Sequence, residues 1–488
     1  LFSVVVLFLC VGILTPKEML EGFSNKGMIT VALLFLVSEG IRQSGTLGQV
    51  IKKLLPQGKT TVFKAQLRIL PSVAFISAFL NNTPVVVIFA PIIKHWAKSV
   101  KLPATKFLIP LSYVTILGGI CTLIGTSTNL VVHGMILEAG YEGFTMFELG
   151  KVGIFIAIAG IIYLFIFSKR LLPDARPDTA VPDEEVEEGE KLHRVEAVLG
   201  ARFPGINKKL SDFNFQRHYG AEVKEIKTRN GQRYVDHLED VVLREGDTLV
   251  VMADDTFIPT WGESSVFVLL TNGNDPDTSG KKKRWLALIL LVLMIVGATV
   301  GELPATKEMF PDIKLDMFFF VCITTIIMAW TNIFPARKYT KYISWDILIT
   351  IACAFAISKA MVNSGVADCV AGFIIGLSDD YGPHVLLAIL FVITNLFTEL
   401  ITNNAAAALA FPLALSISAQ LGVSPTPFFV VICMAASASF STPIGYQTNL
   451  IVQGIGNYKF TDFVRIGLPL NIITFLISVI LIPLIWNF

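Results

Sequence analysis

The stretch LNNTPVVVIFAP, at residues 80–91, places two asparagines and a threonine inside an otherwise apolar segment. A second stretch of the same kind, ITNNAAAALAFP, occupies residues 401–412. Proline closes both stretches, at an offset of 321 (412 − 91). Polar side chains are costly in apolar surroundings, so a repeated interruption of this kind indicates that both stretches contribute to one feature of the fold.

The composition around these stretches is typical of a polytopic membrane protein. Of the 488 residues, 53% are hydrophobic and 16% are charged, whereas a soluble domain has about 25% charged residues. Several apolar runs approach the ~20 residues that a helix needs to cross a bilayer. The clearest of these runs are residues 153–167, 285–301, 316–330 and 465–486. The net charge of +1 suggests no nucleic-acid partner, and the six cysteines form no CxxC pair, so we interpret them as small core residues.

A polar, charged insertion at residues 171–283 interrupts the apolar pattern. Its first part, residues 171–191, has the composition of an acidic linker, and residues 192–280 are predicted to form a small α+β domain. The expected elements are a strand at 193–200, a helix at 205–214, a hairpin with an Asn-Gly turn at 221–234, a strand at 247–254, a short helix at 255–264 and a strand at 265–270. The flanking membrane units are residues 1–170 and 281–488.

Basic residues predict the orientation of the chain. Lys169 and Arg170 precede the insertion, and three lysines and an arginine end it at residues 281–284. Arg337 and Lys338 lie two spans further on, which returns them to the same side. The positive-inside rule therefore predicts that residues 171–283 are cytoplasmic in a multi-pass protein of the inner cell membrane.

The two membrane units repeat one another. GTSTNL at residues 125–130 recurs as GYQTNL at residues 445–450, an offset of 320 (445 − 125). The same offset relates Gly134 to Gly454 and the pair Ser44-Gly45 to Ser364-Gly365. We interpret this register as a duplicated unit. An odd number of crossings between equivalent spans predicts that the two units are inverted, and the count predicts one or two further helices before residue 1.

Each polar stretch lies between two short apolar arms. In the first unit the arms are residues 73–80 and 85–93, and in the second they are residues 392–400 and 405–413. Arms of this length do not span a bilayer alone, so we expect two re-entrant helical hairpins with buried polar tips. In each unit the next span is interrupted by Gly, Ser, Thr and Asn. These breaks lie at residues 122–129 and 441–449, and the second also contains proline.

This arrangement suits the binding of ions. Unwound backbone exposes carbonyl oxygens, which coordinate hard cations such as sodium, while helix N-termini attract anions. The four motifs contain no Lys or Arg, so a bound anion would depend on cations and helix dipoles for neutralisation. The alternative is that the asparagines only join helices to one another. Four motifs in two matched pairs favour the binding site.

At these residues the sequence resembles the divalent anion:sodium symporter family, the solute carrier 13-like transporters. Members carry a Ser-Asn-Thr motif at each hairpin tip and a Thr-x-x-Gly-(Thr/Ser)-Pro-Pro-Asn-like break in the following helix. The matching residues here are Asn81, Asn82 and Thr83; Thr402, Asn403 and Asn404; Thr122, Gly125 and Asn129; and Pro443, Gly445 and Asn449. The resemblance implies an all-α polytopic homodimer in which two inverted repeats, with re-entrant hairpins and broken helices, carry a dicarboxylate or sulfate with sodium by an elevator-type movement.

The resemblance also implies the site residues. Those expected to contact the anion are Asn81, Asn82, Thr83, Thr126, Thr402, Asn403, Asn404 and Tyr446. Those expected to hold sodium are Asn82, Gly125, Asn129, Thr402, Asn403, Gly445 and Asn449. Asn81 replaces the first serine of the motif, Asn404 replaces the second threonine, and neither break keeps a proline pair. These departures predict a better-kept first sodium site and leave the substrate open.

The insertion resembles the TrkA-C domain, through Gly205, Leu210 and Phe213, the Tyr219-Gly220 turn and the segment Gly246–Leu249. Such domains dimerise and can bind small ligands, including cyclic dinucleotides. Arg202, Lys208, Arg217 and His218 are the candidate phosphate contacts, and the alternative is an ordinary solvated basic surface. Family members commonly carry two such domains in tandem; one is found here, and a second would fall around residues 180–192.

The sequence thus predicts a sodium-coupled symporter of small divalent anions, with sulfate first and a C4-dicarboxylate second. The coupling ion is Na+, the other partners are membrane lipid and a second copy of the chain, and no prosthetic group is expected. Alternatives are a proton-coupled oxyanion transporter and, from another class, a ligand-regulated sensor or channel. The spans contain no nucleophile–base pair or acid pair, so an enzyme is not expected, and the absence of a Walker motif argues against ATP-driven transport.

Overall fold

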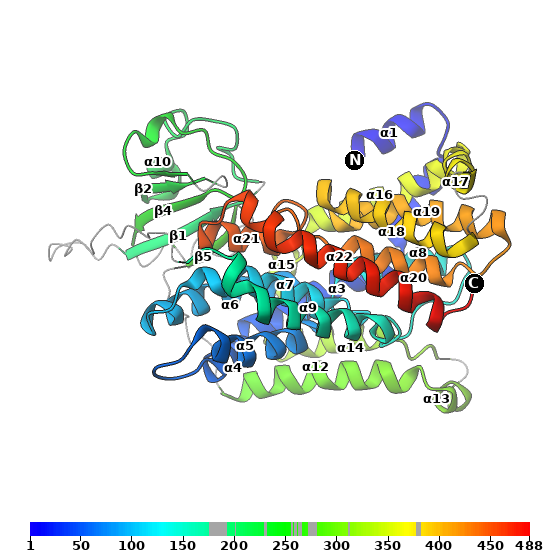
Figure 1. Ribbon diagram of the computed structural model, residues 1–488, viewed down its shortest axis with the longest axis horizontal. Coiled ribbons are helices and arrows are strands. Elements are labelled where there is room, and N and C mark those ends of the chain that lie inside the picture. The colour runs from blue at the N-terminus through cyan, green and yellow to red at the C-terminus, as the bar shows by residue number, and fades with distance from the viewer. Residues whose placement is uncertain are drawn as a thin grey trace.

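Most of the chain is helical in a computed structural model, with a small β-sheet at one end of the helical body (Figure 1). The described residues are 1–174, 193–200, 202–228, 232–254, 257, 261, 266–271, 281–310, 313–376 and 382–488. Within them, seven helices are long and apolar enough to cross a membrane. This matches the prediction of a polytopic membrane protein.

The first unit contains helices α1 to α9. They are α1 Phe2–Cys10, α2 Pro16–Glu21, α3 Lys26–Gln43, α4 Thr46–Leu54, α5 Val62–Ser77, α6 Asn82–Ser99, α7 Leu108–Gly119, α8 Ser127–Glu138 and α9 Gly150–Leu171. The span expected at residues 153–167 is α9, and the span expected to break near residues 122–129 is the pair α7 and α8.

The second unit contains α12 to α22. They are α12 Lys281–Gly301, α13 Pro304–Met309, α14 Met317–Trp330, α15 Tyr339–Tyr342, α16 Trp345–Asn363, α17 Val366–Gly376, α18 Gly382–Leu400, α19 Asn403–Leu421, α20 Thr426–Ser437, α21 Gln447–Gly456 and α22 Phe460–Ile485. The spans expected at 285–301, 316–330 and 465–486 are α12, α14 and α22, and the second break separates α20 from α21.

The same glycine turn divides a helix in each unit. Gly45 separates α3 from α4 with φ 71°, and Gly365 separates α16 from α17 with φ 73°. A positive φ is strained for other residues but not for glycine. The Ser-Gly pairs that revealed the repeat in the sequence therefore mark the same bend in both units.

The hairpin arms are longer than the sequence predicted. The expected arms of eight or nine residues are α5 and α6, of 16 and 18 residues, and α18 and α19, of 19 residues each. Because α18 and α19 are among the seven helices long enough to cross a membrane, the premise that the arms are too short to span is wrong for the second hairpin. Proline lies inside three of these helices, at Pro71, Pro91 and Pro412, without ending them. The apolar runs underestimated the arms because polar residues such as Gln66, buried against Lys106 O at 2.6 Å, extend the helices beyond the runs.

The inserted region forms a five-stranded antiparallel sheet in the order β3-β2-β4-β1-β5. Its elements are β1 His193–Leu199, α10 Phe215–Tyr219, β2 Glu222–Lys227, β3 Arg233–Tyr234, β4 Thr248–Ala253 and β5 Phe267–Thr271. A cluster of aromatic and aliphatic side chains packs inside this region, separate from the core of the helical body. We call the described residues of 193–271 the sheet domain.

The sequence correctly placed four strands, β1, β2, β4 and β5, and the β2–β3 hairpin. The helix that it predicted at residues 205–214 is wrong. There the Asn207 N–H donates to Leu243 O at 2.8 Å and the Leu210 N–H to Val241 O at 3.1 Å. Asn207 has φ 62°, so its backbone cannot continue a right-handed helix. Four other predictions fall outside the described residues, wholly or for the most part. They are the Asn-Gly turn, the acidic linker, the helix at 255–264 and the place of a second TrkA-C domain.

Close glycine packing brings the first hairpin against the broken helix of its own unit. A Cβ added at Gly118 of α7 would lie 2.1 Å from Ala74 O of α5. This distance is shorter than any real Cβ contact, and the neighbouring atom belongs to backbone. The two helices can therefore pack this closely only because residue 118 has no side chain.

We expect Gly118→Ala to lower the melting temperature of the purified protein, because separating α5 from α7 is an overpacking cost of about 1–3 kcal/mol. Gly372→Ala on α17 is the matched control, since its nearest atom, Gln420 Oε1, would lie at 3.8 Å from the new Cβ. Thermal unfolding in detergent measures both variants. Equal melting temperatures for the two would contradict the close α5–α7 contact.

Candidate functional site

The first hairpin tip is held by a buried asparagine. Asn82 begins α6 and is 1% exposed. Its Oδ1 accepts a hydrogen bond from Ser77 Oγ at 2.8 Å, across the tip, and its Nδ2 donates to the Tyr446 hydroxyl at 2.6 Å. Thr83 Oγ1 donates to Gln447 Oε1 at 3.2 Å. The first tip therefore contacts the broken helix of the second unit.

The second tip is built in the same way. Thr398 Oγ1 donates to Asn403 Oδ1 at 2.7 Å, which repeats the Ser77–Asn82 contact at an offset of 321 (403 − 82). Asn404 Oδ1 accepts from Ser127 Oγ at 3.3 Å and from Thr128 Oγ1 at 3.1 Å. The second tip therefore contacts the broken helix of the first unit, and the two contacts cross.

The Tyr446 hydroxyl lies where these contacts meet. It accepts from Asn82 Nδ2 at 2.6 Å, lies 3.2 Å from Thr126 Oγ1, and lies close to the Asn403 side chain. One buried hydroxyl thus bonds the first tip and the first break and faces the second tip. In this closed arrangement, polar groups of all four motifs bond to one another.

Four helices begin at this site without a side-chain cap. They are α6, α8, α19 and α21, of 18, 12, 19 and 10 residues, and their N-cap residues are Asn81, Thr126, Thr402 and Tyr446. Asn and Thr are good capping residues, yet within the described part of the chain no side chain at these four positions bonds to its own helix. The first N–H groups of four helices, with their partial positive charge, are therefore left for another partner.

Three backbone oxygens and one side-chain oxygen gather around the first break. A Cβ added at Gly125 would lie 2.5 Å from Gly119 O and 2.9 Å from Ala78 O. One added at Gly119 would lie 2.7 Å from Asn82 Oδ1 and 3.0 Å from Gly125 O. Four oxygens from three segments therefore lie close to these two glycines, where a side chain on either residue would collide with them. Neutral oxygens at close range are the ligands that sodium and calcium take in proteins.

Asn129 adds an oxygen beside this break. Its Nδ2 donates to Thr122 O at 2.9 Å, while its buried Oδ1 has no hydrogen-bond partner among the described residues. Thr122 Oγ1 in turn donates to Ala78 O and accepts the Gly125 N–H at 3.2 Å. A buried acceptor without a donor is costly unless a ligand takes it up, so Asn129 fits its predicted role as a sodium ligand.

The second break keeps this plan with three changes. Asn449 Nδ2 donates to Thr442 O at 3.1 Å and the Gly445 N–H donates to Thr442 Oγ1 at 3.2 Å, as in the first break. However, Asn449 Oδ1 accepts from Ser112 Oγ at 2.7 Å, so it is already paired. Ser439 stands where Gly119 stands in the first unit, and its Oγ would lie 2.1 Å from a Cβ at Gly445. The second cluster is therefore more crowded.

A carboxylate is the third change. Glu399 replaces Ala78 just before the second tip and is buried. Its Oε1 accepts from the Ser441 N–H and from Asn471 Nδ2, both at 2.8 Å, and its Oε2 lies 3.4 Å from Ser439 Oγ. These bonds tie the tip to the second break and to α22. They also bring a negative charge close to the second oxygen cluster.

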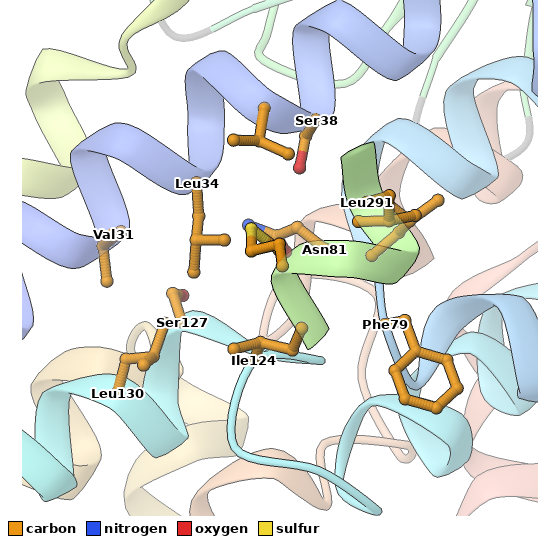
Figure 2. Close-up of a pocket in the computed structure, with 12 residues that line it drawn as sticks. Val31, Leu34, Ser38, Phe79, Asn81, Ile124, Ser127, Leu130 and Leu291 are labelled. Atoms are coloured by element: carbon orange, nitrogen blue, oxygen red, sulfur yellow. The ribbon is translucent and has the colours of Figure 1, made fainter. Parts of the chain in front are cut away.

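Asn81 lines a small cavity between the first tip and α3 (Figure 2). Ser38 and Ser127 also line this cavity, among apolar side chains such as Leu34 and Phe79. Its volume of about 10 Å³ has room for roughly one water molecule. A sulfate ion would need the surrounding segments to move apart.

The structure brings together most of the residues predicted from the sequence. The Tyr446 hydroxyl bonds Asn82 and Thr126, Thr83 bonds Gln447, Asn404 bonds Ser127 and Thr128, and Asn403 bonds Thr398 close to the Tyr446 hydroxyl. Four more of the predicted residues lie at the two breaks: Gly125, Asn129, Gly445 and Asn449. Thr402 begins α19 but its side chain is exposed. Asn81 faces the side cavity.

Three contributing residues were missed by the sequence analysis. Ser77 and Thr398 each hold the asparagine of their tip from five residues before it, and Ser112 bonds both Thr448 and Asn449 from α7. The offset that relates the two tips also relates Ser77 to Thr398, so this pair could have been found. Ser112 has no polar counterpart, because Ile432 stands at the equivalent position.

The candidate phosphate contacts of the insertion are exposed but already partly engaged. Arg202 forms an ion pair with Asp346 at the start of α16, and His218 Nδ1 lies 2.8 Å from Asn214 O. Lys208 and Arg217 are exposed on the sheet domain. Within the described residues, no group of three His, Cys, Asp or Glu could hold a metal ion.

The chain matches the citrate transporter family (CitMHS) over residues 1–415 and 312–488. An uncharacterized transporter from Synechocystis is 30% identical over 99% of this chain and 93% of its own length. Sodium/sulfate cotransporter 2 of Chlamydomonas reinhardtii is 30% identical over 57% of this chain and 31% of its own length. A sodium-dependent dicarboxylate transporter of Staphylococcus saprophyticus is 25% identical over 30% of this chain and 28% of its own length.

The central hydroxyl can be removed with little change in shape. We expect Tyr446→Phe to lower the melting temperature, because it leaves Asn82 Nδ2 and Thr126 Oγ1 buried without this partner, at about 1–3 kcal/mol for an unsatisfied group. Tyr141→Phe is the control, because Tyr141 is exposed. Thermal unfolding measures both, and an unchanged melting temperature for Tyr446→Phe would show that the hydroxyl does not hold the first tip and the first break together.

Proposed function

We infer function from a family membership that is now established: the chain belongs to the citrate transporter family. The names of the family and of the matched relatives describe transporters, so the chain is a multi-pass membrane transporter rather than an enzyme. What remains to be proposed is its substrate, its coupling ion and its mechanism.

We propose that the protein is a sodium-coupled symporter of small divalent anions, with sulfate favoured. The observation that carries this proposal is the meeting of four uncapped helix N-termini beside clusters of neutral oxygens. N–H groups at helix ends stabilise an anion, and carbonyl and amide oxygens suit sodium. The relative named as a sodium/sulfate cotransporter supports this pairing of ions.

The anion would bind where the Tyr446 hydroxyl now bonds the first tip and faces the second. Asn82 Nδ2, Thr83 Oγ1 and the amide of Asn403 are donors that an oxyanion can accept in place of their present partners. The first N–H groups of α6 and α19 add two further sets of donors. Since the four motifs contain no Lys or Arg, the bound anion depends on sodium for charge balance. This dependence couples the binding of the anion to the binding of sodium.

We propose two sodium sites. The first uses the oxygens of Asn82, Gly125, Ala78 and Gly119, with Asn129 Oδ1 as an unpaired acceptor at the same break. The second would use oxygens of Thr398, Asn403 and Thr442 near Gly445, but it has a serine in place of a glycine and a paired Asn449. The first site is therefore the stronger one.

Alternating access would follow from the crossed contacts. The two units are proposed to be inverted repeats, so that one tip faces each side of the membrane while both meet at the site. Tips and broken helices would move together as one unit of an elevator-type homodimer. The sheet domain, proposed to be a TrkA-C domain, lies on the side that the positive-inside rule assigns to the cytoplasm.

Two alternatives keep the same site. A C4-dicarboxylate is supported by the dicarboxylate-transporting relative, and its two carboxylates could use the same donors. The second alternative is coupling to protons instead of sodium. The buried carboxylate of Glu399 beside the second oxygen cluster favours this alternative.

The decisive experiment is uptake into proteoliposomes. Labelled sulfate and labelled succinate are compared under an inward sodium gradient and with choline in place of sodium. We expect sodium-dependent sulfate uptake that succinate competes with weakly. Uptake that persists in choline and follows a proton gradient would contradict sodium coupling, and stronger uptake of succinate would reverse the order of substrates.

A substitution at the first tip tests the site itself. We expect Asn82→Ala to reduce sodium-dependent uptake by about tenfold or more, because a lost hydrogen bond to a charged ligand is worth about 1.5–3 kcal/mol. Asn363→Ala is the control, because Asn363 is exposed and bonds Ile13 O and Glu18 instead. Wild-type uptake by Asn82→Ala would remove this residue from the site.

A further inference from the structure

The sheet domain packs directly on a half-helix of the proposed site. A Cβ added at Gly454 of α21 would lie 2.6 Å from Thr248 Oγ1, and one added at Gly246 would lie 2.6 Å from Leu450 Cδ1. Val198 of β1 is fully buried and belongs to the core of the helical body rather than to that of the sheet domain. Figure 1 shows the sheet at the end of α21, close to α6. Glycine at position 454 makes this approach possible.

An ion pair also joins the sheet domain to the first hairpin. Lys94 Nζ of α6 lies 3.0 Å from both carboxylate oxygens of Glu196 on β1, and Lys227 Nζ of β2 lies 3.4 Å from the same carboxylate. The side chains of Lys94, Glu196 and Lys227 are only 21%, 17% and 4% exposed. Burial disfavours the charged carboxylate, but the two lysines outweigh it and lower the pKa of Glu196 to about 2. The Glu196 carboxylate therefore stays charged at neutral pH.

The contact between the sheet domain and α16 is of a different kind. Arg202 and Asp346 form an ion pair, and their side chains are 46% and 66% exposed. Exposed pairs contribute little because water screens both charges, whereas breaking a buried pair strands a charge away from water. The attachment to α6 and α21 is therefore the firm one, and the attachment to α16 is easily released.

The repeat shows what the sheet domain replaces. In the first unit, Gly134 of α8 packs against the start of α3, with a Cβ at Gly134 lying 2.4 Å from Asn25 Oδ1. Gly454 is the counterpart of Gly134, and Asp346 is the counterpart of Lys26, both at the offset of 320 (454 − 134 and 346 − 26). In the second unit the sheet domain contacts both equivalents, α21 at Gly454 and α16 at Asp346. The sheet domain thus bridges α21 and α16, whereas their counterparts in the first unit, α8 and α3, touch each other directly.

We propose that the sheet domain travels with α6 and α21 as part of the moving unit, and that its ion pair with α16 is a brake that opens in each transport cycle. This inference rests on the proposed function, in which tips and broken helices move together, and it takes α16, which is neither a tip helix nor a broken helix, to stay in place. It assigns Glu196 and Lys94 as positioning residues that tie the domain to the first hairpin. It assigns Arg202 and Asp346 as the releasable contact.

Docking is tested first, without transport. Val198→Cys, in a background whose native cysteines are replaced, carries a thiol that is buried only while the domain is docked. We expect Lys94→Met to raise the rate of maleimide labelling of this thiol several-fold, while Glu196 keeps Lys227 as its partner and the domain stays folded. Lys98→Met is the control, since Lys98 is exposed on the same helix. Equal labelling of the two variants would overturn the tie to α6.

Two cross-links then test movement. One cysteine pair replaces Lys94 and Glu196, the other replaces Arg202 and Asp346, and each is joined by a short bifunctional thiosulfonate that dithiothreitol cleaves. We expect the first link to leave sulfate uptake within about twofold of the uncross-linked protein, because its ends move together. We expect the second link to abolish uptake until dithiothreitol restores it, because it fixes the domain to α16.

The outcomes separate this proposal from the proposed function. If both links block uptake, the domain has to leave α6 during the cycle, and if neither does, it does not move relative to α16; either result overturns the proposal. If the wild type takes up neither sulfate nor succinate, the proposed function fails while thiol labelling still decides the docking. A brake also predicts that Arg202→Ala raises the initial uptake rate, and an unchanged or lower rate contradicts it.

Discussion

The site depends on one constraint: polar groups freed where a helix ends inside an apolar protein need partners. Two helices end and two begin at the hairpin tips. At the two breaks, α7 and α20 end and α8 and α21 begin. The chain meets this need by directing the tips and breaks at one another, with the Tyr446 hydroxyl shared among them. Because each partner belongs to a different segment, the polar centre also decides how the two units pack.

The two units solve this constraint in parallel but not identically. Ser77 and Thr398 hold the tip asparagines in the same way, and Thr122 and Thr442 hold the two glycine turns in the same way. The differences lie at the oxygen clusters. Gly119 leaves the first cluster open, whereas Ser439 fills the second and Glu399 adds a negative charge beside it. A duplicated scaffold thereby gives two oxygen clusters that differ in crowding and in the charge beside them.

The sheet domain adds an asymmetry that the repeat itself lacks. It has its own core, yet Val198 and the Glu196 carboxylate face the helical body. One attachment is a largely buried ion pair, and the other is an exposed ion pair. This difference in solvent exposure, more than the number of contacts, gives the domain a firm partner and a releasable one.

The sequence by itself determined the membrane class, the duplicated register, the position of both tips and both breaks, and the four longer strands of the insertion. These follow from local patterns: apolar length, the nearly constant offset between the two units, and alternation in short strands. Only the tertiary structure decided that each tip contacts the broken helix of the other unit. It also decided that the Tyr446 hydroxyl bonds Asn82 and Thr126, and that Ser112 Oγ donates to Asn449 Oδ1. It also replaced the helix expected at 205–214 with turns and lengthened the hairpin arms. In each case the deciding partner lies far away in the chain, at Leu243 for Asn207 and at Tyr446 for Asn82, so no local pattern records it.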